Sequence, residues 1–129
     1  MKTLLGLVLV AVLMIGVAPA YSGEAVQMWK CEMDDDATEA QVKAMSAKWL
    51  EAVKKQPGGE EFEAFVLFPI AVNATGEMDV MFVVVAPSFQ DWGKFWDAYG
   101  GSPAAALERE NEALVVCPDS VVWESFKLE

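Results

Sequence analysis

The stretch that decides the fold is residues 62–86, FEAFVLFPIAVNATGEMDVMFVVVA. It contains two apolar segments, 62–72 and 78–86, separated by a turn at 73–76, and it predicts two strands joined as a hairpin. Successive side chains of a strand point to opposite faces of its sheet. Both faces are apolar here. In the first segment, one face carries Phe62, Ala64, Val66, Phe68, Ile70 and Val72, and the other carries Phe65, Leu67 and Ala71. In the second, one face carries Met78, Val80, Phe82, Val84 and Ala86, and the other carries Met81, Val83 and Val85. This pattern is typical of a sheet that is covered on both sides.

The sequence on either side of the hairpin supplies the remaining elements. Asp36 or Thr38 can cap a helix that Gln56-Pro57-Gly58-Gly59 ends, and Ser88 can cap a second one. That second helix is broken at Gly100-Gly101 and restarts at Ser102-Pro103. The predicted elements are, in order, a strand at 24–33, a helix to about residue 55, the two hairpin strands, a helix at 88–99 with its continuation at 102–112, and a last strand at 114–117 and 121–128, split by Pro118.

This order of elements, βαββαβ, predicts an α+β domain with a ferredoxin-like fold. Its four-stranded antiparallel sheet has the spatial order 4-1-3-2, so the first and last strands are neighbours. The end of the first strand, near Cys31, then lies beside the start of the last, near Cys117. We therefore predict a Cys31–Cys117 disulfide, as an even number of cysteines in an exported protein also suggests.

Export is predicted from residues 1–20, which have the form of a cleavable secretory signal peptide. Lys2 is followed by an apolar run from Leu4 to Val17 and by Ala18-Pro19-Ala20, a small-x-small cleavage site. The run is shorter than the roughly 20 apolar residues that a membrane span needs. Residues 21–129 then form one domain located in the periplasm or outside the cell, with no membrane association after cleavage.

The charge of the chain excludes some partners. The net charge is −11, and cleavage would remove one lysine and no acid, which gives −12. A nucleic-acid backbone must be neutralised by Lys and Arg, so nucleic acid is not an expected partner. The chain contains no histidine, which excludes Ser-His-Asp and Cys-His nucleophile pairs and His-ligated zinc or haem. The acidic run at 34–36 is interpreted as a solvated helix start, and we expect neither a metal nor a cofactor.

The architecture resembles the dimeric α+β barrel superfamily over roughly residues 24–128. Two helices cover only one face of the sheet, and a second copy packed sheet against sheet would cover the other. The resemblance implies a homodimer, and in some members a small apolar or aromatic ligand is held between the layers. Several enzymes of the superfamily use a histidine, which this chain lacks.

Aromatic residues provide the candidate binding site. The chain has five tryptophans, and such residues either fill a core or form the wall of a pocket. The candidate pocket residues are Trp29, Trp92, Trp96, Tyr99 and Trp123. Lys30, Lys94 or Arg109 could anchor an acidic ligand, although each fits a surface position equally well.

Three functions remain open at this point. The first is a non-enzymatic, exported homodimer that binds a small molecule or a partner protein. The second is a metal-independent enzyme of the dimeric α+β barrel type that acts on an apolar substrate. The third is a structural or adaptor protein that uses the helix-free face of the sheet as a hetero-interface.

Overall fold

The structure, a computed structural model, describes residues 23–71 and 79–129. The predicted signal peptide, the hairpin turn at 73–76, Val72 and Met78 lie outside the described residues. The elements, in order, are β1 (Glu24–Met33), α1 (Glu39–Val53), β2 (Glu63–Leu67), β3 (Val80–Ala86), α2 (Phe89–Asp97), α3 (Pro103–Asn111) and β4 (Val115–Ser125).

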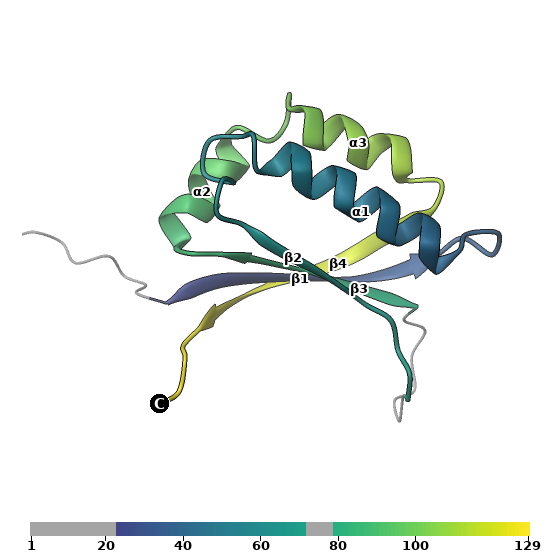
Figure 1. The fold of residues 1–129 in the computed structure, drawn as a ribbon, viewed down its shortest axis with the longest axis horizontal. Helices are drawn as coiled ribbons and strands as arrows, with labels where there is room; N and C mark the ends of the chain where they lie inside the picture. The colour runs from purple at the N-terminus through teal and green to yellow at the C-terminus, as the bar shows by residue number, and fades with distance from the viewer. Residues whose placement is uncertain (1–22, 72–78) are drawn as a thin grey trace, which may run out of the picture.

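The four strands form one antiparallel sheet in the order β2-β3-β1-β4, which is the predicted 4-1-3-2 order read from the other edge. All three described helices lie on one face of this sheet, with α1 and α3 side by side and α2 near one end (Figure 1). The ferredoxin-like α+β fold is therefore confirmed.

Local sequence signals set the helix boundaries. Thr38 caps α1 in a capping box, because its hydroxyl accepts from the Gln41 N–H and the Gln41 side chain accepts from the Thr38 N–H. Ser88 caps α2, and Ser102 caps α3 with Pro103 in the first turn. The break at Gly100-Gly101 is thus confirmed, and the two helices on either side of it can point in different directions.

Two strand predictions are wrong in extent. The second strand ends at Leu67, well short of residue 72; Pro69, two residues later, has no N–H to donate to a neighbouring strand. The last strand is continuous from Val115 to Ser125, with no split at Pro118. The register of this strand against β1 shifts between Lys30 and Glu32, and the strand lies at the edge of the sheet. Proline lacks an N–H to donate to a neighbouring strand and is tolerated at such positions.

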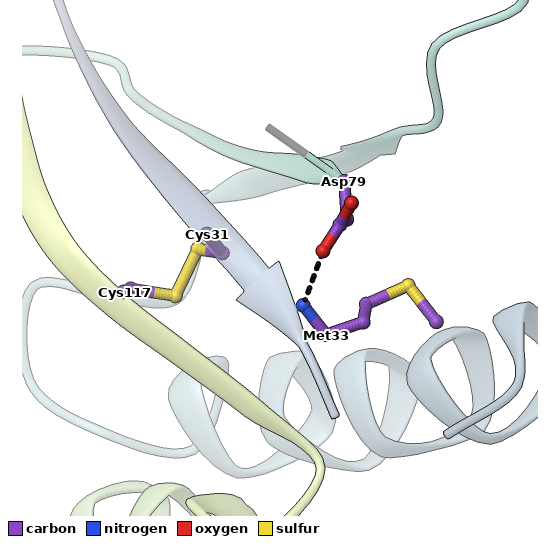
Figure 2. The surroundings of a disulfide bond; sticks show 4 residues. All are labelled: Cys31, Met33, Asp79 and Cys117. Atoms are coloured by element: carbon purple, nitrogen blue, oxygen red, sulfur yellow. Dashed lines mark hydrogen bonds between the residues drawn. A yellow bond between two sulfur atoms is a disulfide. The ribbon is translucent and has the colours of Figure 1, made fainter. Parts of the chain in front are cut away.

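The predicted disulfide is present at this irregularity. Figure 2 shows Cys31 of β1 bonded to Cys117 of β4, with Cα atoms 4.1 Å apart and 86 positions apart in the sequence. Nearby, the Asp79 carboxylate accepts a hydrogen bond from the Met33 N–H at 3.0 Å, which ties the start of β3 to the end of β1. Cys31 itself is buried with Val42 and Val80.

The core lies between the sheet and the helices. Its larger cluster centres on Phe95 of α2, whose ring centroid is 4.8 Å from that of Phe62. Val53 of α1 and Val84 of β3 are buried in the same cluster. Helix-facing residues of the hairpin, such as Val80, Val84 and Ala86, are almost completely buried, as the sequence pattern predicts.

The helix-free face of the sheet is apolar as well. The strand register forms rows across this face: Trp123 lies beside Val26, which lies beside Val85, and Val121 lies beside Met28, which lies beside Val83. Phe65 of β2 extends the second row opposite Val83. Leu67, opposite Met81, begins the next row, which continues with Lys30 and Asp119. In the single chain Trp123 is 56% exposed and Phe65 48%. The prediction that the hairpin is apolar on both faces is confirmed for β2 and β3, apart from Glu63, which pairs with Val85 on the helix-free side. It is wrong for Ile70, which follows the end of β2 and is fully exposed. We call the helix-free surface the sheet face.

Candidate functional site

A cavity of about 460 Å³ lies between the helix layer and the covered side of the sheet. Its walls come from all four strands on one side and from α1, the end of α2 and α3 on the other. Its volume is in the range of small-molecule sites in proteins, about 300–1,000 Å³. The residues that carry the argument below are Trp29, Trp49, Phe82, Trp96, Tyr99 and Glu108.

Aromatic rings in mutual contact form one wall of the cavity. The centroids of Trp29 and Trp96 are 6.1 Å apart, and those of Trp96 and Tyr99 are 4.6 Å apart. Trp96 also packs against Phe95, which fixes its ring from behind. The Nε1 atom of Trp96 is enclosed and has no hydrogen-bond partner among the described residues, so this donor is not accessible from the cavity.

A short chain of hydrogen bonds runs along the cavity. The Nε1 of Trp49 donates to the Tyr99 hydroxyl at 2.9 Å, and that hydroxyl donates to Oε2 of Glu108. These contacts link α1, the segment after α2, and α3 through side chains. The network thus ties together the three segments that border the cavity on its helix side.

Tyr99 is held as a neutral proton donor. Burial of its phenol, first of all, and then its hydrogen bond to the Glu108 carboxylate raise the pKa of Tyr99 well above its ordinary value. The hydrogen bond from Trp49 opposes this shift only in part, because it favours the phenolate. Tyr99 therefore keeps its proton and remains hydrogen-bonded to Glu108 at neutral pH.

The structure brings together three of the five predicted pocket residues. Trp29, Trp96 and Tyr99 line the cavity. Trp92 does not line it, and its Nε1 instead donates to Oε1 of the buried Gln27 at 2.9 Å. Trp123 lies on the sheet face, on the other side of the sheet, because it pairs with Val26 of β1.

Sequence reasoning missed Trp49, Phe82 and Glu108 as site residues. Trp49 falls on the apolar stripe of α1 and Phe82 on the covered face of β3, so a signal for both was present in the helix and strand periodicities. Glu108 offers no such signal. It lies on a polar helix and is brought to the cavity by the turn at Gly100-Gly101, which sends α3 back along α1 (Figure 1).

The cations predicted as possible anchors do not line the cavity. Lys30, Lys94 and Arg109 are exposed and absent from its wall. Lys43 does reach the cavity, but its Nζ is 3.4 Å from the Glu39 carboxylate and 5.1 Å from the centre of the Phe68 ring. Across residues 23–71 and 79–129, no group of His, Cys, Asp or Glu is arranged to hold a metal ion, and no helix there is long and apolar enough to cross a membrane.

Comparison with known proteins supports the fold. No protein-family model matches the sequence, and no curated protein matches it. A dabb family protein with a ferredoxin-like fold from Mesorhizobium loti MAFF303099 matches with 11% identity and a TM-score of 0.50, over 84% of this chain and 100% of that one.

Two further solved structures are similar at a lower level. One is a dimeric protein of unknown function from Bacteroides fragilis NCTC 9343, with 14% identity, a TM-score of 0.46, and coverage of 81% of this chain and 99% of that one. The other is a dimeric ferredoxin-like protein from Thermobifida fusca YX, with 18% identity, a TM-score of 0.47, and coverage of 84% and 94%. At these identities the likeness concerns the fold alone, and the Mesorhizobium loti structure agrees with the ferredoxin-like fold predicted from the sequence.

Proposed function

We propose that this protein is an exported binding protein that holds a small apolar or aromatic molecule in the cavity beneath α1 and α3, and that it acts as a homodimer. The observation that carries the binding function is the cavity itself. It is roomy, its wall is mainly aromatic and aliphatic, and few polar groups enter it, which is the composition of small-molecule sites in general.

Two alanines of α1 provide a matched test of binding. Both are exposed on the same helix, but only Ala47 lines the cavity, and Ala44, one turn earlier, does not. Native mass spectrometry of the purified protein should detect a retained small molecule. Ala47→Phe should abolish that retention and Ala44→Phe should leave it unchanged. Equal retention in both variants would show that the cavity is not the site.

The homodimer is supported by the sheet face. Its neighbouring apolar side chains, among them Phe65, Leu67, Val121 and Trp123, are between 43% and 56% exposed in the single chain. Contiguous apolar patches of this kind are uncommon on monomers and mark interaction surfaces. A two-fold axis would pack the sheet face of one copy against the sheet face of a second copy. The second copy would then cover the side of the sheet that the helices leave exposed.

Analytical ultracentrifugation tests the dimer. The wild type should sediment as a dimer and Trp123→Lys as a monomer, because a charge would be buried at the interface. Leu128→Lys is the control, since Leu128 is 91% exposed and follows the end of β4. A wild type that is monomeric at high concentration would contradict the homodimer and favour the adaptor function with a hetero-interface.

Export is supported by residues 1–20 together with the start of the fold. Cleavage after Ala20 removes nothing from the described domain, because β1 begins at Glu24. Intact-mass measurement of protein recovered outside the cytoplasm should give an N-terminal Tyr21. A mass that includes residues 1–20 would contradict cleavage.

One observation favours the second function, a metal-independent enzyme. Tyr99 is a buried proton donor at the cavity wall, and its partner Glu108 is a carboxylate at the same wall. Positioned acid and base groups of this kind can transfer protons to a substrate. Chemical alteration of the retained molecule by the wild type, and its loss in Tyr99→Phe, would establish the enzyme; recovery of the molecule unchanged would favour simple binding.

A further inference from the structure

The cavity combines aromatic ring faces with one carboxylate. Trp29, Trp96 and Tyr99 form a continuous row of rings, and Trp49 joins Tyr99 through its Nε1. Glu108, bonded to the hydroxyl of Tyr99, is the only carboxylate side chain that lines the cavity within the described part of the chain.

The face of an aromatic ring is negative and its edge is positive. A cation that approaches the face within about 6 Å of the centroid is attracted, most strongly by tryptophan. The Nε1 of Trp96 is enclosed, so its donor dipole is not offered to a ligand. Trp96 lines the cavity through its other atoms, and its indole is the ring type that attracts a cation most strongly.

The carboxylate of Glu108 adds a negative charge at the same wall. Its Oε2 is used by the Tyr99 hydroxyl, and an ionised carboxylate has about four acceptor positions in all, so it can accept further hydrogen bonds. Tyr99 fixes Glu108 in place rather than neutralising it, because the phenol is an uncharged donor. An anionic ligand would be repelled here, and a neutral one would gain little.

Two cations lie near the cavity. The positive charge of Arg109 acts to lower the pKa of Tyr99, although Arg109 does not line the cavity. Lys43, the one cation that lines it within the described residues, is held by the Glu39 carboxylate and lies over Phe68. The net charge of the whole chain is −11, and a field of this sign raises the local concentration of cations and their rate of association.

We propose that the ligand is an organic cation: an amine or quaternary ammonium compound with an apolar or aromatic body. Its charged group lies against the ring faces of Trp96 and Tyr99 beside Glu108, and its apolar body fills the rest of the cavity. A volume of about 460 Å³ accommodates both parts. This assignment rests on the proposed function, that the cavity binds a small molecule, and it adds the chemical class of that molecule.

The test uses two probes of the same shape and different charge, benzyltrimethylammonium and its carbon analogue neopentylbenzene. Binding to the full mature protein is followed by tryptophan fluorescence. We expect the cation to bind at least about tenfold more tightly than the hydrocarbon, which is about 1.4 kcal/mol.

Two charge variants on α3 locate the effect. Glu108→Gln keeps the shape of the side chain and an acceptor for Tyr99, and it should weaken binding of the cation by about tenfold while leaving the hydrocarbon unaffected. Glu110→Gln is the control, because Glu110 is exposed on the same helix, as Glu108 is, but does not line the cavity. It should change either affinity by less than about twofold, because its charge lies away from the cavity wall and is screened by solvent. Unchanged binding of the hydrocarbon shows that the Glu108→Gln variant is folded.

The outcomes separate this inference from the proposed function. Equal binding of the two probes, tighter binding of the hydrocarbon, or equal losses in Glu108→Gln and Glu110→Gln would overturn the cation assignment and leave the binding cavity in place. If neither probe binds the wild type, and the Ala47→Phe variant also retains the same molecules as the wild type, the cavity is not a binding site and both proposals fail.

Discussion

The Cys31–Cys117 disulfide should supply a large part of the stability of this domain. A cross-link acts mainly by restricting the unfolded chain, and the effect grows with the number of residues in the closed loop. With 86 positions between the cysteines, the chain-entropy relation gives about 4.6 kcal/mol at 25 °C. Domains of this size have total stabilities of about 5–15 kcal/mol, so a third or more of the folding free energy is at stake.

The assay compares one sequence in two oxidation states, so that no side chain changes. Urea unfolding of the wild type with and without a phosphine reductant should show the reduced protein to be less stable by about 4–5 kcal/mol. Its melting temperature should be lower by roughly 15–20 °C. The slope of free energy against urea should rise on reduction, because the open chain exposes more surface when it unfolds.

A double variant, Cys31→Ala with Cys117→Ala, is the control for reoxidation. Cys31 is 1% exposed, so this variant should be slightly less stable than the reduced wild type, through the lost packing of the buried sulfur. Oxidised and reduced wild type that differ by less than about 1 kcal/mol would refute the reasoning, since the cross-link would then not restrict the unfolded chain as the loop length requires.

Four further predictions concern single residues. Gly93→Ala should stabilise the protein by about 0.5–1 kcal/mol, because Gly93 is inside α2 with open space around it. Gly58→Ala should destabilise the protein by more than about 1 kcal/mol. Gly58 has a φ of +87°, and an added Cβ would lie 2.6 Å from the Asp91 carbonyl oxygen. Urea unfolding checks both, and a loss of stability in Gly93→Ala would contradict the first. Thr38→Ala should cost about 1 kcal/mol through loss of the capping box, and unchanged stability would show that the cap contributes nothing. The pKa of Tyr99 is raised in the folded protein, whereas the phenol of the unfolded chain ionises near the ordinary value of about 10. The stabilisation from the neutral, buried phenol is therefore fully present below about pH 10 and is lost as the pH rises above it. Alkaline unfolding should depend less on pH in Tyr99→Phe, and identical pH profiles would exclude the effect.

The fold could be predicted because its signals are local or pairwise. Capping residues such as Thr38, Ser88 and Ser102 mark helix starts, and the alternation in 80–86 predicts a strand with two apolar faces. Once the order of elements indicates the sheet, the placement of Cys31 beside Cys117 follows from topology alone. The exact ends of the strands could not be predicted from the sequence, because the effect of a proline depends on its place in the sheet. Pro69 follows the end of β2, whereas Pro118 lies within β4, an edge strand with an irregular register that tolerates it.

The site was only partly predictable, for a geometric reason. An aromatic residue in a strand or helix gives the same periodic signal whether it fills a core or forms the wall of a cavity. Trp29 and Trp96 line the cavity, whereas Trp92, four residues before Trp96, bonds to Gln27 instead. Glu108 lies at the cavity only because α3 returns along α1, and that return angle is set by packing rather than by a motif.

The pairing of β1 with β4 has a consequence for how the chain matures. The first strand has β4 as one neighbour, which follows the other described elements in the sequence, and Glu24 pairs with Ser125 of that strand. A nascent chain that lacks β4 leaves one edge of β1 open and Cys31 without its bonding partner, so the sheet and the bridge can be completed only once β4 has emerged from the ribosome. For the exported protein that we propose, this delay is useful, because a chain that has not yet folded can still be threaded through a translocation channel.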